Sequence, residues 1–104
     1  MADFYQIGRD ATAAGTTTVV RASGELDINA RDDLYETIVA ALAMGDVVVD
    51  LADVTFIDSE ALGALIDGYN AATARDLEFR VVNPRGLVGR VLSVSGALEL
   101  FGSL

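Results

Sequence analysis

The chain has 104 residues, seven basic and sixteen acidic side chains, a formal net charge of −9, and neither cysteine nor histidine. Without thiolates or imidazoles it forms no disulfides, no zinc or iron–sulfur site and no histidine-based catalytic triad. All seven basic residues are arginines, which also excludes Schiff-base chemistry and phosphate loops that depend on lysine.

The acidic residues are spread along the chain, which indicates a solvated acidic surface around an ordinary core. Such a surface repels a polyanion, so we expect no nucleic-acid partner. No window approaches the roughly 18 to 20 apolar residues of a membrane-spanning helix, and residues 1–10 lack the basic and apolar regions of a signal peptide. We therefore expect one domain over residues 1–104, located in the cytoplasm and not inserted directly into a membrane.

The first part of the chain predicts two strands. Residues 4–7 suit a short strand and residues 9–15 are rich in turn formers. The threonines and valines of residues 16–22 suit a second strand, which we expect to end at Ser23 and Gly24.

A helix and a buried strand are predicted next. Asn29 is the expected N-cap of the helix, and Gly45 is its expected end. The β-branched run of residues 47–51 predicts a strand covered on both faces, followed by a bend at residues 52–57. The apolar positions at helical spacing are Leu34, Ile38, Ala41 and Leu42.

The second half continues the alternation of helices and strands. Asp58 and Ser59 are candidate caps of a helix, and alternation over residues 78–82 predicts a strand with one wetter side. The apolar stripe of that helix contains Leu62, Leu65, Ile66 and Tyr69.

A third helix is expected near the C-terminus. Pro84 suits its first position and Gly96 its end, and residues 98–104 suit a short last strand. Its predicted stripe consists of Leu87, Val88, Val91 and Leu92. Strands that alternate with helices predict an α/β fold with a mostly parallel sheet of four to five strands and helices packed on at least one face.

The end of the central strand and the start of the second helix form the candidate site, because partners of open α/β sheets meet the carboxyl ends of strands. Residues 50–63 read DLADVTFIDSEALG. The stretch 47–65 resembles the STAS domain of bacterial anti-sigma factor antagonists. Their pattern is a hydrophobic strand, Asp-Leu, a turn, Val-Thr-Phe-Ile-Asp-Ser, a second serine, a glycine and Leu-Gly. The sequences GELD at residues 24–27 and VSG at residues 94–96 resemble two further features of that family.

The resemblance implies a STAS-type single domain that acts by partner switching. In that family the unmodified domain binds an anti-sigma factor that is also a serine kinase, and so frees the sigma factor. Phosphorylation of the serine at the helix start ends that binding. The implied partner is a kinase of similar small size, and the domain is expected as a monomer or weak homodimer without a cofactor. The implied partner-binding residues are Asp27, Asp58, Ser59, Glu60 and Ala61.

The sequence departs from this pattern at the phosphosite. Glu60 occupies the position of the phosphorylated serine, and Ala61 that of the following glycine. Because a glutamate accepts no phosphate, Glu60 either imitates the phosphorylated state or leaves the antagonist always active. A third alternative is that Ser59 or Thr55 has become the phosphoacceptor.

A purely structural interpretation of the same residues is also open. Glutamate in a first helical turn is favourable by about 0.3 to 1 kcal/mol, and alanine is a better helix former than glycine by up to about 1 kcal/mol. Both substitutions then only strengthen the helix start, and the protein binds without regulation. In this interpretation Asp58 is a plain N-cap and Asp27 an ordinary loop aspartate.

Other functions compete with partner switching. Asp50, Asp53 and Asp58 could form a magnesium site for phosphoryl chemistry. A receiver domain also needs a lysine, however, so we expect neither a metal site nor an enzyme. The more serious alternative is a STAS accessory subunit of a membrane lipid or anion transporter, or a module of a stress-signalling scaffold. A structural homo-oligomer also remains open.

Overall fold

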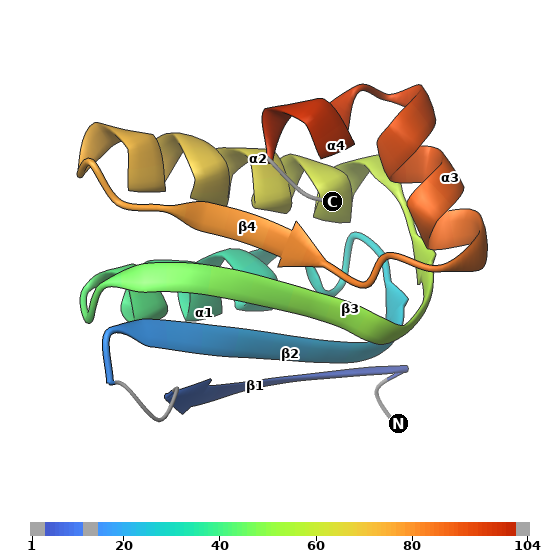
Figure 1. Cartoon of the computed structure of the whole chain (residues 1–104). Coiled ribbons are helices and arrows are strands. Elements are labelled where there is room, and N and C mark those ends of the chain that lie inside the picture. Colours follow the sequence, from blue (N-terminus) through green and yellow to red (C-terminus); the bar gives the residue numbers. More distant parts are fainter. Residues whose placement is uncertain (1–3, 12–14, 102–104) are drawn as a thin grey trace.

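One four-stranded sheet forms the framework of the protein. The computed structural model describes residues 4–11 and 15–101. The strands lie side by side in chain order: β1 (Tyr5–Ala11), β2 (Thr17–Leu26), β3 (Asp46–Ile57) and β4 (Phe79–Val82). β1 runs antiparallel to β2, whereas β2, β3 and β4 are parallel to one another (Figure 1). The predicted α/β fold with a mostly parallel sheet is therefore confirmed.

The two longest helices cover one face of the sheet. Helices α1 (Arg31–Leu42) and α2 (Ser59–Ala74) lie behind the strands in Figure 1, and two shorter helices lie beyond β4, near α2. These are α3 (Gly86–Val94) and α4 (Ala97–Leu100). Every pair of parallel strands is thus joined by a helical crossover, as a parallel sheet requires.

The core lies between the sheet and this helical layer. Three aromatic rings close it at the side of β4: Phe79 lies 5.7 Å from Phe101 and 6.5 Å from Tyr69, measured between ring centroids. The largest completely buried side chains come from strands, helices and the C-terminal segment alike, and include Val20, Leu26, Leu34, Ile38, Leu51, Leu65, Val81, Leu92 and Phe101. The core stripe predicted for the first helix is confirmed, because all four of its side chains are buried.

Strand β3 is longer than the sequence predicts. Two irregularities in its pairing disturb the sequence pattern of its second half, which is why the prediction missed that half. The expected bend at residues 52–57 is wrong: β3 continues to Ile57. Its pairing with β2 shifts register between Arg21 and Ser23 and again between Gly24 and Glu25. Each shift leaves an extra residue in β3, so the buried positions Leu51, Val54 and Ile57 fall three apart instead of two. This spacing removes the alternation that identifies a strand in a sequence.

The first two strands also extend beyond their predicted ends. The sequence predicts a turn at residues 9–15, but residues 9–11 continue β1; residues 12–14 lie outside the described part. β2 does not end at Gly24 but continues to Leu26. Gly24 has a φ of 85°, and the next residue donates its N–H to the Phe4 carbonyl oxygen at 2.8 Å. Because Gly24 has no side chain, β2 can adopt this left-handed conformation next to the Phe4 carbonyl oxygen and continue beyond it.

The start of α1 differs from the prediction. Ala30, not Asn29, is the N-cap residue, and its side chain makes no capping hydrogen bond. The helix ends at Leu42, slightly before the predicted Gly45, which follows with a φ of 138°. The turn before α1 is organised instead by Asp27, whose carboxylate accepts the N–H of Asn29 at 2.9 Å. Asp27 therefore orders the turn that leads into α1, but it does not cap the helix.

The C-terminal part contains two corrections. Pro84 lies before α3 and not at its first position; Arg85 is the N-cap residue and the helix begins at Gly86. The predicted last strand at residues 98–104 is wrong, because α4 ends at Leu100 and residues 102–104 lie outside the described part. The physical reason is burial at helical spacing: Ala97 and Phe101 are four residues apart and both are buried.

Candidate functional site

The start of α2 is held in place by hydrogen bonds from its capping aspartate. The Asp58 carboxylate accepts the N–H of Ala61 at 2.9 Å, which confirms Asp58 as the N-cap. The main-chain N–H of Asp58 donates to the Leu26 carbonyl oxygen at 3.0 Å. The last residue of β2 therefore positions the first turn of α2, and the two sequence motifs at residues 24–27 and 54–59 meet in space.

Ser59 and Glu60 occupy the exposed side of this first turn. Ser59 is the first residue of α2 and is exposed; among the described residues its hydroxyl has no hydrogen-bond partner. It is therefore not a cap, contrary to one of the two predictions for the helix start. The Glu60 side chain is 44% exposed and its Oε1 lies 3.0 Å from Nη1 of Arg31. Glu60 thus faces solvent and forms an ion pair with the first residue of α1.

The remaining predicted residues are not all accessible. Asp27 is half-buried and its carboxylate is engaged in the turn before α1. Thr55 is exposed, but its hydroxyl donates to the Gly24 carbonyl oxygen at 3.3 Å. Ala61 is completely buried, so only its N–H takes part in the site, and there it serves the cap. The structure therefore brings Asp27, Ser59 and Glu60 to one surface and keeps the Ala61 side chain out of it.

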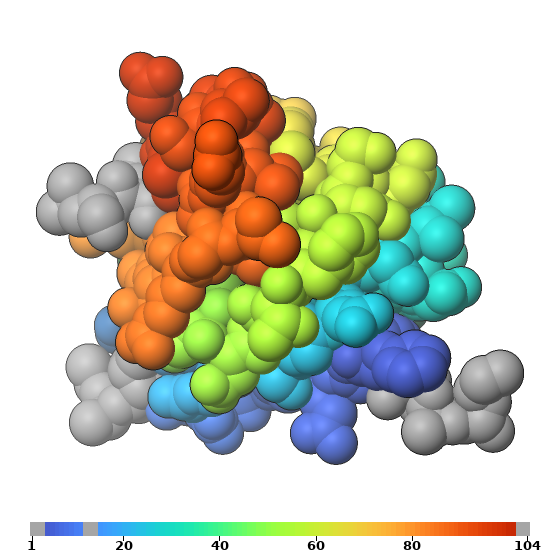
Figure 2. All heavy atoms as spheres, turned by 90° about the vertical axis from the view of Figure 1, so that its right-hand side faces the viewer, coloured from blue at the N-terminus to red at the C-terminus, as the bar shows by residue number. Residues whose placement is uncertain are grey.

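An apolar groove lies beside this helix start, and the sequence did not predict it. It has a volume of about 480 Å³ and runs between α2 and α3. Leu87 and Val94 are 67% and 81% exposed there, although Leu87 was assigned to the buried stripe of its helix. Figure 2 shows α3 in orange next to the yellow-green start of α2. The groove is lined by Ser59, Leu62, Leu87, Arg90, Val91, Val94 and Ser95.

A signal for this groove is present in the sequence of α3. Leu87, Val91 and Val94 recur at i, i+4 and i+7, which gives the helix a second apolar stripe beside the one that contains Val88 and Leu92. A helix of a small protein buries only one such stripe in its own core. The other stripe is left for solvent or for a partner. Exposed apolar residues that gather in one hollow are typical of an interaction surface.

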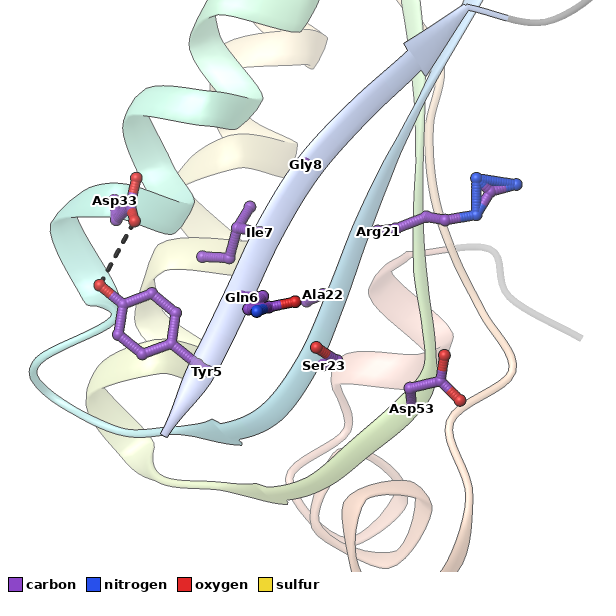
Figure 3. A pocket seen from close by; sticks show the side chains of 9 residues that line it. All are labelled: Tyr5, Gln6, Ile7, Gly8, Arg21, Ala22, Ser23, Asp33 and Asp53. Atoms are coloured by element: carbon purple, nitrogen blue, oxygen red, sulfur yellow. Dashed lines mark hydrogen bonds between the residues drawn. The ribbon is translucent and has the colours of Figure 1, made fainter. Parts of the chain in front are cut away.

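A second hollow follows the edge of the sheet, but its polar groups do not converge. It has a volume of about 550 Å³ and includes residues of β1, β2 and α1. Figure 3 shows Tyr5 and Ile7 directed toward α1, with the Tyr5 hydroxyl donating to Asp33 at 3.3 Å, whereas Arg21 and Asp53 lie on the other side of β1. The hollow therefore gives a ligand no common set of polar contacts.

The three aspartates that suggested a magnesium site have separate structural surroundings. Asp50 accepts hydrogen bonds from the Ala52 N–H at 3.0 Å and from Nδ2 of Asn83 at 3.1 Å. Asp58 is the cap of α2, and Asp53 is exposed. In residues 4–11 and 15–101, no three acidic side chains form a group that could hold a metal ion. Over the same residues, no helix is long and apolar enough to cross a membrane.

Known proteins resemble this chain in sequence and in fold. A family model described as "Mlab, STAS domain" matches residues 10–102. An anti-sigma-B factor antagonist of Staphylococcus epidermidis is 30% identical over 83 residues, which cover 78% of this chain and 77% of that protein. The crystal structure of an anti-sigma factor antagonist from Mycobacterium paratuberculosis superposes with a TM-score of 0.83 at 27% identity, over 95% of this chain and 84% of that one.

Two solved structures of lower identity share the fold. The phosphorylated form of SpoIIAA, a Bacillus cell fate determinant, superposes with a TM-score of 0.74 at 22% identity, over 95% of this chain and 89% of that one. The murine anion transporter Slc26a9 superposes with a TM-score of 0.69 at 18% identity. That match covers 82% of this chain but 14% of the transporter.

Proposed function

Because the chain belongs to the STAS domain family and its curated relatives include anti-sigma-B factor antagonists, we propose that it binds an anti-sigma factor and thereby frees a sigma factor. The partner is a serine kinase of similar small size that binds ATP. The protein is itself a binding module without catalysis, acts in the cytoplasm where sigma factors meet RNA polymerase, and is a monomer or weak homodimer.

The observation that carries this proposal is the surface at the start of α2. The Glu60 side chain is 44% exposed there, and Ser59, the preceding residue, lines the apolar groove that contains Leu87 and Val94. Apolar side chains near the centre of an interface supply most of the binding free energy, whereas a polar rim supplies specificity. A groove of this kind, with the polar side chains Ser59 and Arg90 in its lining, has both components. We therefore place the partner across α3 and the first turn of α2.

Regulation at this surface differs from the serine switch that the family resemblance implies. Glu60 accepts no phosphate, so a covalent switch requires another hydroxyl. Of the two alternatives, Ser59 is the better acceptor, because its hydroxyl is exposed and unengaged, whereas the Thr55 hydroxyl is bonded to Gly24. A phosphate on Ser59 would lie at a helix N-terminus, where backbone N–H groups stabilise negative charge. It would also place two charges at the rim of an apolar groove, which opposes docking.

Binding to purified partners tests the function directly. The chain is titrated, by calorimetry in the presence of ADP, into each ATP-binding anti-sigma factor that its own organism encodes. We expect a saturable one-to-one complex with one of them, and displacement of the sigma factor from that protein in size-exclusion chromatography. Saturable binding to none of these proteins would refute the proposal.

The accessory subunit of a transporter is the second candidate function. The likeness to the Slc26a9 transporter favours it at the level of the fold alone. The two functions predict different partners: the antagonist co-purifies with an ATP-binding kinase of similar size, and the accessory subunit with a membrane transport complex. Affinity purification of the tagged chain from detergent-solubilised cells therefore separates them.

A further inference from the structure

An ion pair joins the two helix starts on the proposed docking surface. Nη1 of Arg31, the first residue of α1, lies 3.0 Å from Oε1 of Glu60, which is 29 positions later in the chain. The two side chains are 47% and 44% exposed. The pair is therefore accessible to a partner, and the residue at the phosphoserine position already has a positively charged neighbour.

The acidic neighbours of this pair are occupied in other ways. Asp27 accepts the Asn29 N–H and Asp58 the Ala61 N–H, so both carboxylates stabilise the backbone. Asp33, in the first turn of α1, accepts the Tyr5 hydroxyl. Among the described residues of this surface, Glu60 is the one acid whose carboxylate is paired with a guanidinium.

The free energy that such an ion pair contributes depends on whether it is exposed to water or covered by a partner. An exposed ion pair adds little to folding stability, because water and salt screen both charges. A carboxylate that is covered without a counter-ion suffers the full desolvation penalty, whereas a paired one suffers much less. Arg31 therefore matters little for the fold and strongly for whether Glu60 can be covered.

We infer that Arg31 is a specificity-determining residue that neutralises Glu60, so that the partner meets a closed ion pair instead of a free carboxylate. This inference rests on the proposed function and specifies its regulation. A phosphoserine carries close to two negative charges at neutral pH, whereas the Arg31–Glu60 ion pair has a net charge of zero. The surface thus corresponds to the unphosphorylated state of a relative with a serine, and the antagonist is always active at this position.

The two residues differ in what their removal leaves behind. Without Arg31, the carboxylate of Glu60 remains near the α2 backbone and is covered unpaired. Without Glu60, the guanidinium of Arg31 remains on a long flexible side chain that reaches water at the rim of the interface. Loss of the arginine should therefore weaken binding, whereas loss of the glutamate should not.

Four variants test this asymmetry by calorimetric titration with the purified anti-sigma kinase that binds the wild-type chain, in the presence of ADP. We expect Arg31→Gln to raise the Kd at least tenfold, Glu60→Gln to change it less than threefold, and the double variant to return to within threefold of wild type. Arg75→Gln is the matched control, because it removes the same charge from the opposite end of α2. It should bind like wild type, and urea unfolding should show that all four variants remain folded.

The outcomes separate the inference from the function on which it rests. If Glu60→Gln lowers the Kd tenfold while Arg31→Gln leaves it unchanged, Glu60 is a permanent imitation of phosphate and the inference is wrong, although the function stands. If all variants bind within threefold of wild type, the pair has no role in recognition and the inference is wrong as well. If the wild-type chain binds no anti-sigma kinase, the proposed function fails, and the inference with it.

Discussion

The main-chain N–H of Asp58 donates a hydrogen bond of 3.0 Å to the carbonyl oxygen of Leu26, and this bond ties the end of β2 to the start of α2. Asp27 follows one of these residues and Ser59 the other. Two segments that are remote in the chain are therefore fixed against each other by this backbone bond, and the Thr55 hydroxyl adds a second hydrogen bond to the Gly24 carbonyl oxygen. A partner that covers Ser59 and Glu60 also meets the turn of Asp27, and substitutions at these positions should act on one binding event.

The first prediction separates the two roles of Asp27. Asp27→Asn keeps an oxygen that accepts the Asn29 N–H but removes the charge, whereas Asp27→Ala removes both. We expect the asparagine variant to lose affinity for the kinase while its free energy of unfolding stays within about 0.5 kcal/mol of wild type. The alanine variant should lose a further 0.5 to 1.5 kcal/mol of stability, roughly the contribution of one hydrogen bond. Urea unfolding and calorimetry measure the two effects, and unchanged affinity of Asp27→Asn would remove Asp27 from the interface.

The second prediction concerns Glu60, which we propose lies at the phosphoserine position of the family. Glu60→Ser places a hydroxyl at the second position of α2, and we expect the cognate kinase with ATP to add one phosphate there. The wild-type chain should remain unlabelled, and the double variant Ser59→Ala with Glu60→Ser should be labelled like the single one. Intact-mass spectrometry reads the result. Label on the wild-type chain that disappears in Ser59→Ala would instead assign the acceptor to Ser59, and no label on Glu60→Ser would count against the alignment.

The third prediction tests the groove with a pair of matched variants. Leu87 is 67% exposed beside α2, and Met44 is 63% exposed in the turn that follows α1. Leu87→Asp should weaken kinase binding at least tenfold, because it puts a charge in the apolar part of the interface. Met44→Asp makes a similar change outside that groove and should bind like wild type. Equal affinity of the two variants in calorimetry would show that the groove is not used.

The fourth prediction concerns Gly24 in β2. A Cβ atom at Gly24 would collide with the carbonyl oxygen of Phe4, and the φ of 85° is strained for any other residue. Gly24→Ala should therefore cost more than about 2 kcal/mol of folding stability. Gly8→Ala is the control in the neighbouring strand, because a Cβ there meets no atom within 4 Å. Its unfolding free energy should stay near that of wild type, and equal losses in both variants would refute the steric explanation.

The parts of the fold that the sequence predicted are those in which local pattern and burial agree. The stripe of Leu34 and Ile38 and the cap Asp58 appear as expected, because each follows from periodicity or from one hydrogen bond. The strand at residues 47–51 also forms, but the prediction that it is covered on both faces is wrong, because Val48 and Asp50 are only partly buried. Residues 52–57 were misread because β-bulges replace the period of two by a spacing of three. Such bulges depend on the pairing with another strand, which a single sequence does not contain.

The neighbourhood of the candidate residues could be predicted from the sequence, but their contacts could not. The motif placed Asp27, Glu60 and Ser59 together, and the structure brings them to one surface. The motif gave no indication of Arg31, because an ion pair between residues 29 positions apart depends on how two helices pack. The helical periodicity assigned Leu87 to the core, because periodicity alone does not tell which of two adjacent apolar stripes faces inward.

The two bulges of β3 have a consequence for how this surface could change over evolutionary time. Both lie in the part of the strand that leads to α2, after the regular ladder between Val48 and its neighbours. The loss of one extra residue there would rotate Thr55 and Phe56 relative to the helix while the paired core of the sheet stays as it is. Single-residue deletions in this short span therefore offer a route to new partner preferences that leaves the regular pairing of residues 46–50 undisturbed.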